Sequence, residues 1–167
     1  MNGLTVRETG KGKGVFAGRD FRKGEEIMEF RGNLITFDEL PKPYNMDDDH
    51  YVQIGPNLLM GPSGGLDDLF NHSCEPNSYL RITGRKAVLI ALRDMGKGEE
   101  ITWDYSLSMN KESSWYKMTC RCGSRNCRKV ISDFSRLPDD VKNRYIRLGV
   151  VPEYVLKEAK IVKKASR

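Results

Sequence analysis

The sequence predicts a mostly β domain made of small sheets, followed by a helical segment at the C-terminus. Short apolar runs between glycines fill residues 1–35, and a nine-residue segment occurs twice. After residue 127 the apolar residues instead recur every three to four positions, which is typical of an amphipathic helix. A length of 167 residues suits one globular domain, with room for a short extension.

Three segments are predicted as strands from their apolar residues and flanking turn signals. The run Val15–Ala17 lies between two glycines, and residues 25–30 follow the turn signal Lys23-Gly24. Residues 87–92 contain three consecutive branched apolar residues and are expected to form the most buried strand. Residues 36–70 carry four prolines and several glycines, so we expect long loops there, with one short strand at 51–54.

The repeated segment covers residues 19–27 and 93–101. The two copies agree at seven of nine positions and begin 74 residues apart. Two copies are too few for a solenoid, which needs at least three. We therefore expect one turn-and-strand unit to be used twice within a small β fold.

Two helices are expected at the C-terminal end. Leu137, Val141, Tyr145 and Leu148 have helical spacing, with acidic residues at the start of the segment and Gly149 at its end. A second short helix is predicted from Pro152 to about residue 163. Residues 132–167 would thus form a C-terminal helical extension.

Composition and charge exclude several classes of protein. Hydrophobic residues make up 38% of the chain, and no run approaches the roughly 20 apolar residues of a membrane span. Residues 1–14 contain no apolar core of a secretory signal, so we expect a protein of the cytoplasm, or of the nucleus in a eukaryote. A membrane protein, a collagen-like chain and a secreted disulfide-rich domain are disfavoured.

The net charge of +5 is distributed unevenly along the chain. Residues 1–110 carry 13 basic and 17 acidic residues, whereas residues 111–167 carry 15 and 6. Within the first part, residues 36–79 hold eight acidic residues and a single lysine. This acidic stretch would attract a basic partner and the C-terminal part an acidic one, although both are also compatible with ordinary solvated surface.

The cysteines form a candidate metal site. Cys120, Cys122 and Cys127 have the spacing C-x-C-x₄-C, and Cys74 lies in a distant loop. Four thiolates around zinc would give a closed, structural site. Two disulfides, with three possible pairings, and free thiols are the alternatives, and disulfides are less expected without a secretion signal. A zinc-ribbon-like nucleic-acid module using Arg121, Arg125, Arg128 and Lys129 is a further alternative, although ribbons usually pair two C-x₂-C units.

Four segments in a fixed order resemble a known family. They are Gly12-Lys13-Gly14-Val15-Phe16-Ala17, Asn71-His72-Ser73-Cys74-Glu75-Pro76-Asn77, Gly98-Glu99-Glu100-Ile101-Thr102-Trp103-Asp104-Tyr105, and the three-cysteine cluster. This order resembles the SET-domain protein lysine methyltransferases with a post-SET zinc motif, in particular short microbial members. The resemblance implies a catalytic domain over residues 1–110, a zinc segment over 111–131, and a knot-like crossing of segments 71–77 and 98–105.

The resemblance also implies a cofactor and its contacts. S-adenosylmethionine would supply the methyl group, and the target lysine would enter from the opposite face through a narrow channel. The residues implied to bind the cofactor are Gly12, Lys13, Gly14, Val15, Phe16, Tyr51, Asn71, His72 and Val130. The family often has Arg at the position of Asp68, so one cofactor contact is expected to be missing or replaced.

Tyr105 matches the catalytic tyrosine of the family. Methyl transfer to an amine needs a neutral amine, alignment and exclusion of water, and at neutral pH at most about 0.1% of free lysine is neutral. Burial beside a positive charge lowers that pKa, and the phenol would orient the amine. Trp103 and Ile131 would line the lysine channel, with Trp115 a possible addition. The number of methyl groups added stays open.

The expected activity is methylation of lysine in a basic protein, such as a histone-like tail, which the acidic stretch would attract. A catalytically silent SET-fold module that binds peptides is the first alternative. A zinc-dependent nucleic-acid binder that uses the basic C-terminal part is the second.

Overall fold

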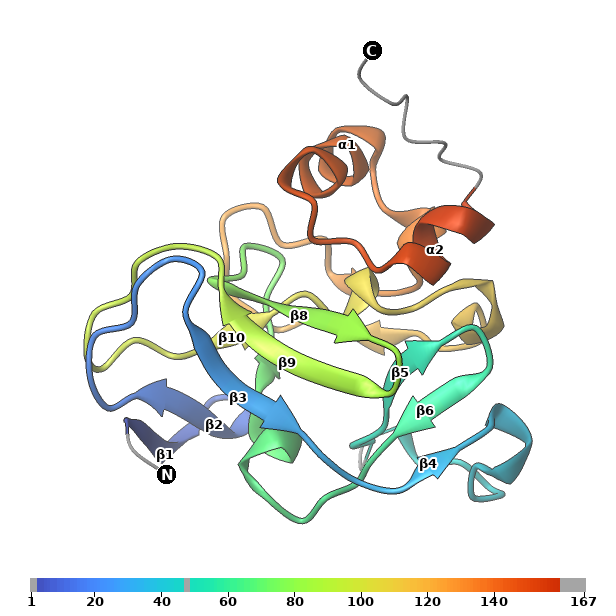
Figure 1. The fold of residues 1–167 in the computed structure, drawn as a ribbon, viewed down its shortest axis with the longest axis horizontal. Helices are drawn as coiled ribbons and strands as arrows, with labels where there is room; N and C mark the ends of the chain where they lie inside the picture. Colours follow the sequence, from blue (N-terminus) through green and yellow to red (C-terminus); the bar gives the residue numbers. More distant parts are fainter. Residues whose placement is uncertain (1–2, 47–48, 160–167) are drawn as a thin grey trace.

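Over residues 3–46 and 49–159, which the computed structural model describes, the chain forms five small sheets and two helices (Figure 1). The strands are β1 (Leu4–Thr9), β2 (Gly12–Ala17), β3 (Glu26–Phe30), β4 (Leu34–Ile35), β5 (Val52–Gly55), β6 (Leu58–Met60), β7 (Asn71–His72), β8 (Ser78–Thr83), β9 (Lys86–Ala91), β10 (Thr102–Trp103), β11 (Met118–Thr119) and β12 (Val130–Ile131). The α-helices are α1 (Asp139–Leu148) and α2 (Glu153–Glu158). The mostly β prediction is confirmed.

The central sheet has the antiparallel order β3-β9-β8. β9 lies in the middle, and Ala87, Leu89, Ile90 and Ala91 are all buried within it. The predicted strand at 87–92 is therefore this central strand. Burial on both faces explains why its apolar residues are consecutive instead of alternating.

A second antiparallel sheet has the order β4-β6-β5. β5 corresponds to the strand expected at 51–54. β6 was not predicted, because a three-residue strand directly after the turn residues Pro56-Asn57 is too short to show a periodicity. Loops and short 3-10 helices, at Phe37–Glu39 and Leu66–Leu69, occupy much of the remainder of the described part of 36–70, as expected from its prolines and glycines.

The two copies of the repeat, residues 19–27 and 93–101, adopt the same turn. Gly24 has a φ of 84° and Gly98, at the equivalent position, a φ of 95°. Residues with a side chain rarely adopt this backbone conformation, so both turns depend on glycine. The prediction of a unit used twice agrees with this geometry.

The two turns also hydrogen-bond to each other reciprocally. The Phe21 amide donates to the Met95 carbonyl at 2.9 Å, and the Met95 amide donates to the Phe21 carbonyl at 2.9 Å. Two side-chain bonds cross in the same way: the Lys23 amide to Asp94 Oδ1 at 2.8 Å, and the Lys97 amide to Asp20 Oδ1 at 2.8 Å. Each copy therefore completes the backbone hydrogen bonding of the other.

Segments 71–77 and 98–105 lie side by side through the parallel pair β7 and β10. The Asn77 side chain ties them together, since its Nδ2 donates to the Glu100 carbonyl at 2.8 Å and its Oδ1 accepts from the Thr102 amide at 2.9 Å. A buried asparagine can satisfy a donor and an acceptor at once, which suits two adjacent backbones. We refer to this pairing of segments as the crossing.

The C-terminal helices pack against the β domain beside β8 (Figure 1). The contact is an apolar cluster that includes Phe134, Tyr145, Val150 and Val155. α1 ends at Gly149 with a φ of 69°, as the sequence predicts. Leu148 was expected on the apolar face but is 47% exposed, whereas Ile146 before it and Val150 and Val151 after it pack in or against the cluster.

α2 ends at Glu158, whereas the sequence predicted a helix to about residue 163. Residues 160–163 of that prediction lie outside the described residues. Among the described residues, no helix is long and apolar enough to cross a membrane.

Leu89→Ala and Leu148→Ala make the same chemical change at a buried and at an exposed position. Leu89 is fully buried, so we expect the free energy of unfolding to fall by about 2–5 kcal/mol. We expect a change of at most about 0.5 kcal/mol for Leu148→Ala. Guanidinium denaturation of both variants measures this difference, and equal losses would contradict the assigned core.

Candidate active site and metal centre

Asn71 joins the glycine-rich strand β2 to the crossing. Its Nδ2 donates to the Lys13 carbonyl at 3.1 Å and to Glu100 Oε1 at 2.8 Å. A Cβ at Gly14 would lie 2.7 Å from that Nδ2. Gly14 is therefore required for the close packing of β2 against the Asn71 side chain.

The edge of β2 beside this contact is open and polar. Gly12 has a φ of 96°, and a Cβ there would meet no atom within 4 Å. Lys11 Nζ pairs with Glu100 Oε2 at 3.1 Å. The edge therefore offers bare backbone, an amide and a charged pair to a polar ligand, which fits the amino-acid end of S-adenosylmethionine.

Other residues expected to bind the cofactor lie in different surroundings. Val15 is fully buried in the main core, and Phe16 is partly buried beneath the Arg7 guanidinium. No surface of Val15 is exposed to a ligand, and its carbonyl accepts from the Ile101 amide at 2.8 Å. Val130 on β12 is 46% exposed, whereas Ile131 next to it is buried against the cysteines.

Tyr105 stands at the end of the crossing. Its hydroxyl donates to the Phe70 carbonyl at 2.6 Å, and its ring packs against Trp103 with a centroid distance of 4.8 Å. Burial, and next the negative charge of Asp49, raises the pKa of the Tyr105 hydroxyl. The phenol is therefore protonated at neutral pH and able to donate a hydrogen bond.

A small cavity lies beside Tyr105, and its lining is largely aromatic. The aromatic residues that line it are Phe30, Tyr51, Trp103, Tyr105 and Tyr116. Three carboxylates also border it, those of Asp49, Asp67 and Asp68. Trp115 does not line the cavity. It is 45% exposed and packs edge-on against Tyr44.

Asp68, which replaces the family's frequent arginine, closes a loop. Its carboxylate accepts hydrogen bonds from the backbone amides of Ser63, at 3.0 Å, and Gly64, at 2.7 Å. The carboxylate therefore satisfies local backbone donors at the rim of the cavity.

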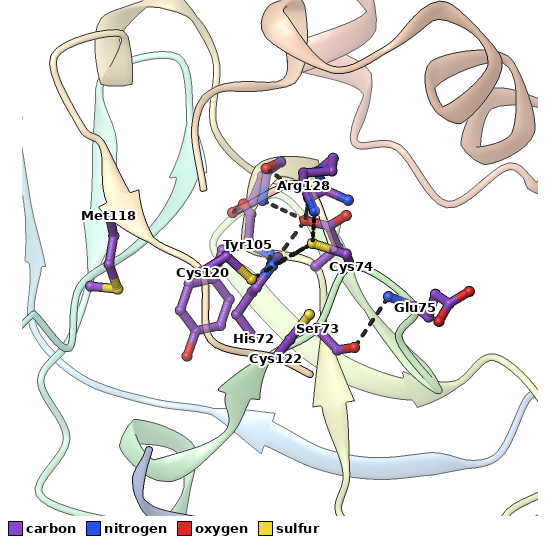
Figure 2. Close-up of polar contacts among 12 residues, drawn as sticks. His72, Ser73, Cys74, Glu75, Tyr105, Met118, Cys120, Cys122 and Arg128 are labelled. Carbon is purple, nitrogen blue, oxygen red and sulfur yellow. Dashed lines mark hydrogen bonds and ion pairs between the residues drawn. The ribbon is translucent and has the colours of Figure 1, made fainter. Parts of the chain in front are cut away.

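His72 connects Tyr105 to the cysteines. Its Nδ1 accepts from the Tyr105 amide at 3.2 Å, so its proton lies on Nε2, which is 3.4 Å from Cys74 Sγ. Burial lowers the pKa of His72 to about 4, which keeps the ring neutral. Figure 2 shows the imidazole beside the Tyr105 ring, whose hydroxyl points away from the labelled sulfurs.

The resemblance assigned only the His72 backbone. Its side-chain contact was missed, and the signal for it was a histidine two residues before a candidate ligand.

The four cysteine sulfurs converge as expected. Sγ atoms of Cys74, Cys120, Cys122 and Cys127 all lie within 4.8 Å of one another, and Cys74 and Cys120 Sγ are 3.7 Å apart. Sulfurs bound tetrahedrally to zinc at about 2.3 Å are separated by about 3.8 Å. No pair is bonded as a disulfide, since all four cysteines are free. The cluster therefore fits a zinc ion.

Polar groups around the cysteines favour thiolates. The Arg128 amide points to Cys74 Sγ at 3.4 Å, and Ser124 Oγ lies 3.2 Å from Cys122 Sγ. With the His72 contact, these groups stabilise negative charge on sulfur. Such contacts orient metal ligands and tune their basicity.

Asp104 is a fully buried carboxylate between the cysteines and α1. Arg128 Nη2 donates to its Oδ1 at 2.7 Å, the Tyr145 hydroxyl donates to its Oδ2 at 2.9 Å, and the Ser106 amide donates at 3.1 Å. This role was not predicted from the sequence. The signal was a carboxylate between the aromatic residues Trp103 and Tyr105.

Comparison with known families matches the SET domain over residues 12–106, more than half of the chain. The chain belongs to the SET-domain family. This SET domain therefore has the fold that its motifs indicate, and the crossing and Tyr105 both lie within the matched region.

Several curated proteins are similar to this SET domain. Histone-lysine N-methyltransferase trithorax of Drosophila virilis is 33% identical over 132 residues, which are 72% of this chain and 3% of the relative. Histone-lysine N-methyltransferase Su(var)3-9 of Drosophila melanogaster is 30% identical over 148 residues, which are 73% and 23% of the two chains. The chain thus spans less than a quarter of the length of these relatives.

Solved structures show the same fold. KRYPTONITE in complex with mCHH DNA, H3(1-15) peptide and SAH superposes with a TM-score of 0.62 at 22% identity. The match covers 77% of this chain and 29% of KRYPTONITE. A second KRYPTONITE structure, with mCHG DNA and SAH, gives the same TM-score at 24% identity.

Arg128→Met tests the buried charge of Asp104. Without its guanidinium partner the carboxylate stays buried, so we expect the free energy of unfolding to fall by about 3–5 kcal/mol in urea denaturation. The control is Arg81→Met, which breaks the exposed pair with Glu26 and should cost less than about 1 kcal/mol. Similar losses in both variants would show that Asp104 does not depend on Arg128.

Proposed function

We propose that this chain is an S-adenosylmethionine-dependent protein-lysine methyltransferase that acts on a basic protein segment such as a histone-like tail. The observation that carries the proposal is that, in a SET domain, the Tyr105 hydroxyl and the β2 strand both bond to neighbouring residues of the crossing segment: the hydroxyl donates to the Phe70 carbonyl, and the next residue, Asn71, donates to the Lys13 carbonyl. The names of the similar histone-lysine N-methyltransferases support the reaction class, and SAH and H3 peptide in the KRYPTONITE complex support the cofactor and substrate class.

The residues near Gly12 would hold the cofactor. When bound, S-adenosylmethionine supplies an electrophilic methyl group. The Lys13 carbonyl, the Asn71 amide and the Glu100 carboxylate would bind polar groups of its amino-acid end, and Gly12 leaves room for close approach. Tyr51, which the resemblance places near the carboxylate of the cofactor, lines the cavity beside Tyr105.

Tyr105 would orient the target amine. A lysine has an ordinary pKa of about 10.4, so burial in the aromatic cavity must favour its neutral form before it reacts. The protonated phenol, fixed by the Phe70 carbonyl and the Trp103 ring, presents a preorganised dipole at the cavity. Trp103 has no hydroxyl group, so within the crossing Tyr105 is the aromatic residue whose hydroxyl can bind the amine.

We also infer that zinc occupies the cysteine cluster and that it is structural. Four thiolates complete a tetrahedral shell and leave no position for substrate. The bound metal would hold residues 120–127 against the loop at 71–77, in accord with the expected division into a catalytic domain, a zinc segment at 111–131 and a helical extension. The names of the similar proteins specify histone lysine as their substrate. For this reason the nucleus is the expected compartment if the source is eukaryotic.

The nucleic-acid alternative has less support. The described part of the extension, residues 132–159, contributes apolar side chains to the cluster around Tyr145, so its first role is packing. Its basic residues remain compatible with a solvated surface. The silent peptide-binding module differs from an enzyme only in turnover, which the Tyr105 variant below tests.

Zinc binding can be measured directly. We expect one zinc ion per chain by mass spectrometry of the metal content, and a lower thermal midpoint after chelation that zinc restores, because binding of structural zinc is coupled to folding. Cys74→Ser should lose the metal. Denatured protein should present four reactive thiols. Two disulfides, seen as no reactive thiol, would contradict the zinc assignment.

Tyr105→Phe tests catalysis. We expect transfer of labelled methyl groups to mixed histones or a cell lysate to fall by about 10²-fold or more, with cofactor affinity changed little, because the preorganised hydroxyl that would orient the amine is lost. Tyr79→Phe is the control, since Tyr79 packs near α1 and should retain the wild-type rate. Cofactor binding without transfer by the wild type would favour the silent module.

A further inference from the structure

Asp49 places a carboxylate at the cavity, and tyrosines hold it there. The Tyr44 hydroxyl donates to Asp49 Oδ1, and the Tyr51 amide donates to the same oxygen at 3.0 Å. Burial, and next the charge of Asp49, raises the pKa of the Tyr116 hydroxyl. Two of these three tyrosines, Tyr51 and Tyr116, line the cavity themselves.

The other two carboxylates at the cavity have backbone partners instead. Asp67 Oδ2 accepts from the Arg31 amide at 2.8 Å, and Asp68 Oδ2 accepts from the Gly64 amide at 2.7 Å. These bonds shape loops. Asp67 also accepts from the Ser63 hydroxyl through its Oδ1. At Asp49, the Tyr44 hydroxyl and the Tyr51 amide share one oxygen, Oδ1, and a carboxylate has about four acceptor sites. Its carboxylate can therefore accept a further donor from a ligand.

The surroundings of Asp49 suit a cation. Burial raises the pKa of Asp49 even though its hydrogen bonds lower it, so a cation in the cavity would offset part of the cost of burying this charge. The walls contributed by Trp103, Tyr105 and Tyr116 are aromatic, and aromatic faces attract ammonium groups. The charge of Asp49 also acts on the Tyr105 hydroxyl, so both groups share one site.

We propose that Asp49 is the anionic partner that binds the ammonium of the target lysine, and of its methylated forms, as the side chain enters the cavity beside Tyr105, a binding step that precedes loss of the proton and methyl transfer. This inference rests on the proposed function. It names a specificity residue that the SET motifs do not contain. An alkyl chain ending in a cation is selected over a neutral chain of the same length, because only the cation offsets the cost of burying the carboxylate charge.

A binding measurement tests the site without turnover. The probes are n-butylammonium and butan-1-ol, which have similar shape but differ in charge, titrated at neutral pH while the tryptophan and tyrosine side-chain NMR signals are recorded. Wild-type protein should bind butylammonium more tightly. Asp49→Asn keeps the acceptor for Tyr44 and should lose this preference, whereas Asp49→Glu should retain part of it. Asp38→Asn, an exposed acidic residue outside this cavity, is the control.

The same preference in wild type and Asp49→Asn would overturn the inference, as would no binding of butylammonium to the wild type. Near-ultraviolet circular dichroism checks that the variants keep the folded structure.

Kinetics separate this inference from the proposed function. With a lysine peptide methylated by the wild type, Asp49→Asn should raise KM by about 30-fold or more, as expected when one partner of a buried charge pair is removed, and should lower kcat less. An unchanged KM would overturn the role of Asp49 and leave the methyltransferase intact. A wild type without activity on any protein would contradict the methyltransferase, and the probe titration would still decide whether the cavity binds alkyl cations.

Discussion

The arrangement of the site depends on the burial of one carboxylate, Asp104. A charge removed from water is costly unless it is paired, and its partners come from three parts of the chain: Arg128 beyond the last cysteine, Tyr145 in α1 and the Ser106 amide next to the crossing. The cysteine loop, the crossing and the C-terminal helix are therefore held in one relative position. Because Tyr105 follows Asp104 directly, the same hydrogen bonds fix the backbone that carries the phenol.

His72 couples the metal centre to the catalytic candidate in a second way. Its single proton is directed to Cys74 Sγ, while its other nitrogen accepts from the Tyr105 amide. One neutral imidazole thus supports a metal ligand and the backbone of the tyrosine. A phenol that must orient an amine gains from such a rigid support, because small displacements at a reacting centre cost rate.

The features that the sequence could predict are those encoded locally. Apolar runs and turn glycines indicated β2, β3 and β9, and helical spacing with a terminal Gly149 indicated α1. β6 was not predicted, because a strand of three residues is too short to show an alternating pattern. The hydrogen-bond partners of Asp104 and Asp49 could not be predicted for a different reason. Their hydrogen bonds depend on how distant or irregular segments fold together, and Tyr145, for example, lies 41 positions from Asp104. The crossing became predictable only through the family motifs, since no local pattern pairs residue 71 with residue 102.

The reciprocal bonding of the two repeated turns has a consequence for synthesis on the ribosome. The Phe21 amide and carbonyl find their partners only at Met95, so the N-terminal turn stays incomplete until more than half of the chain has emerged. Closing a loop of this length is entropically costly before the contacts form, and a nascent chain meanwhile exposes strand edges that attract other chains. Chaperone protection during translation therefore matters more for this domain than its modest size suggests.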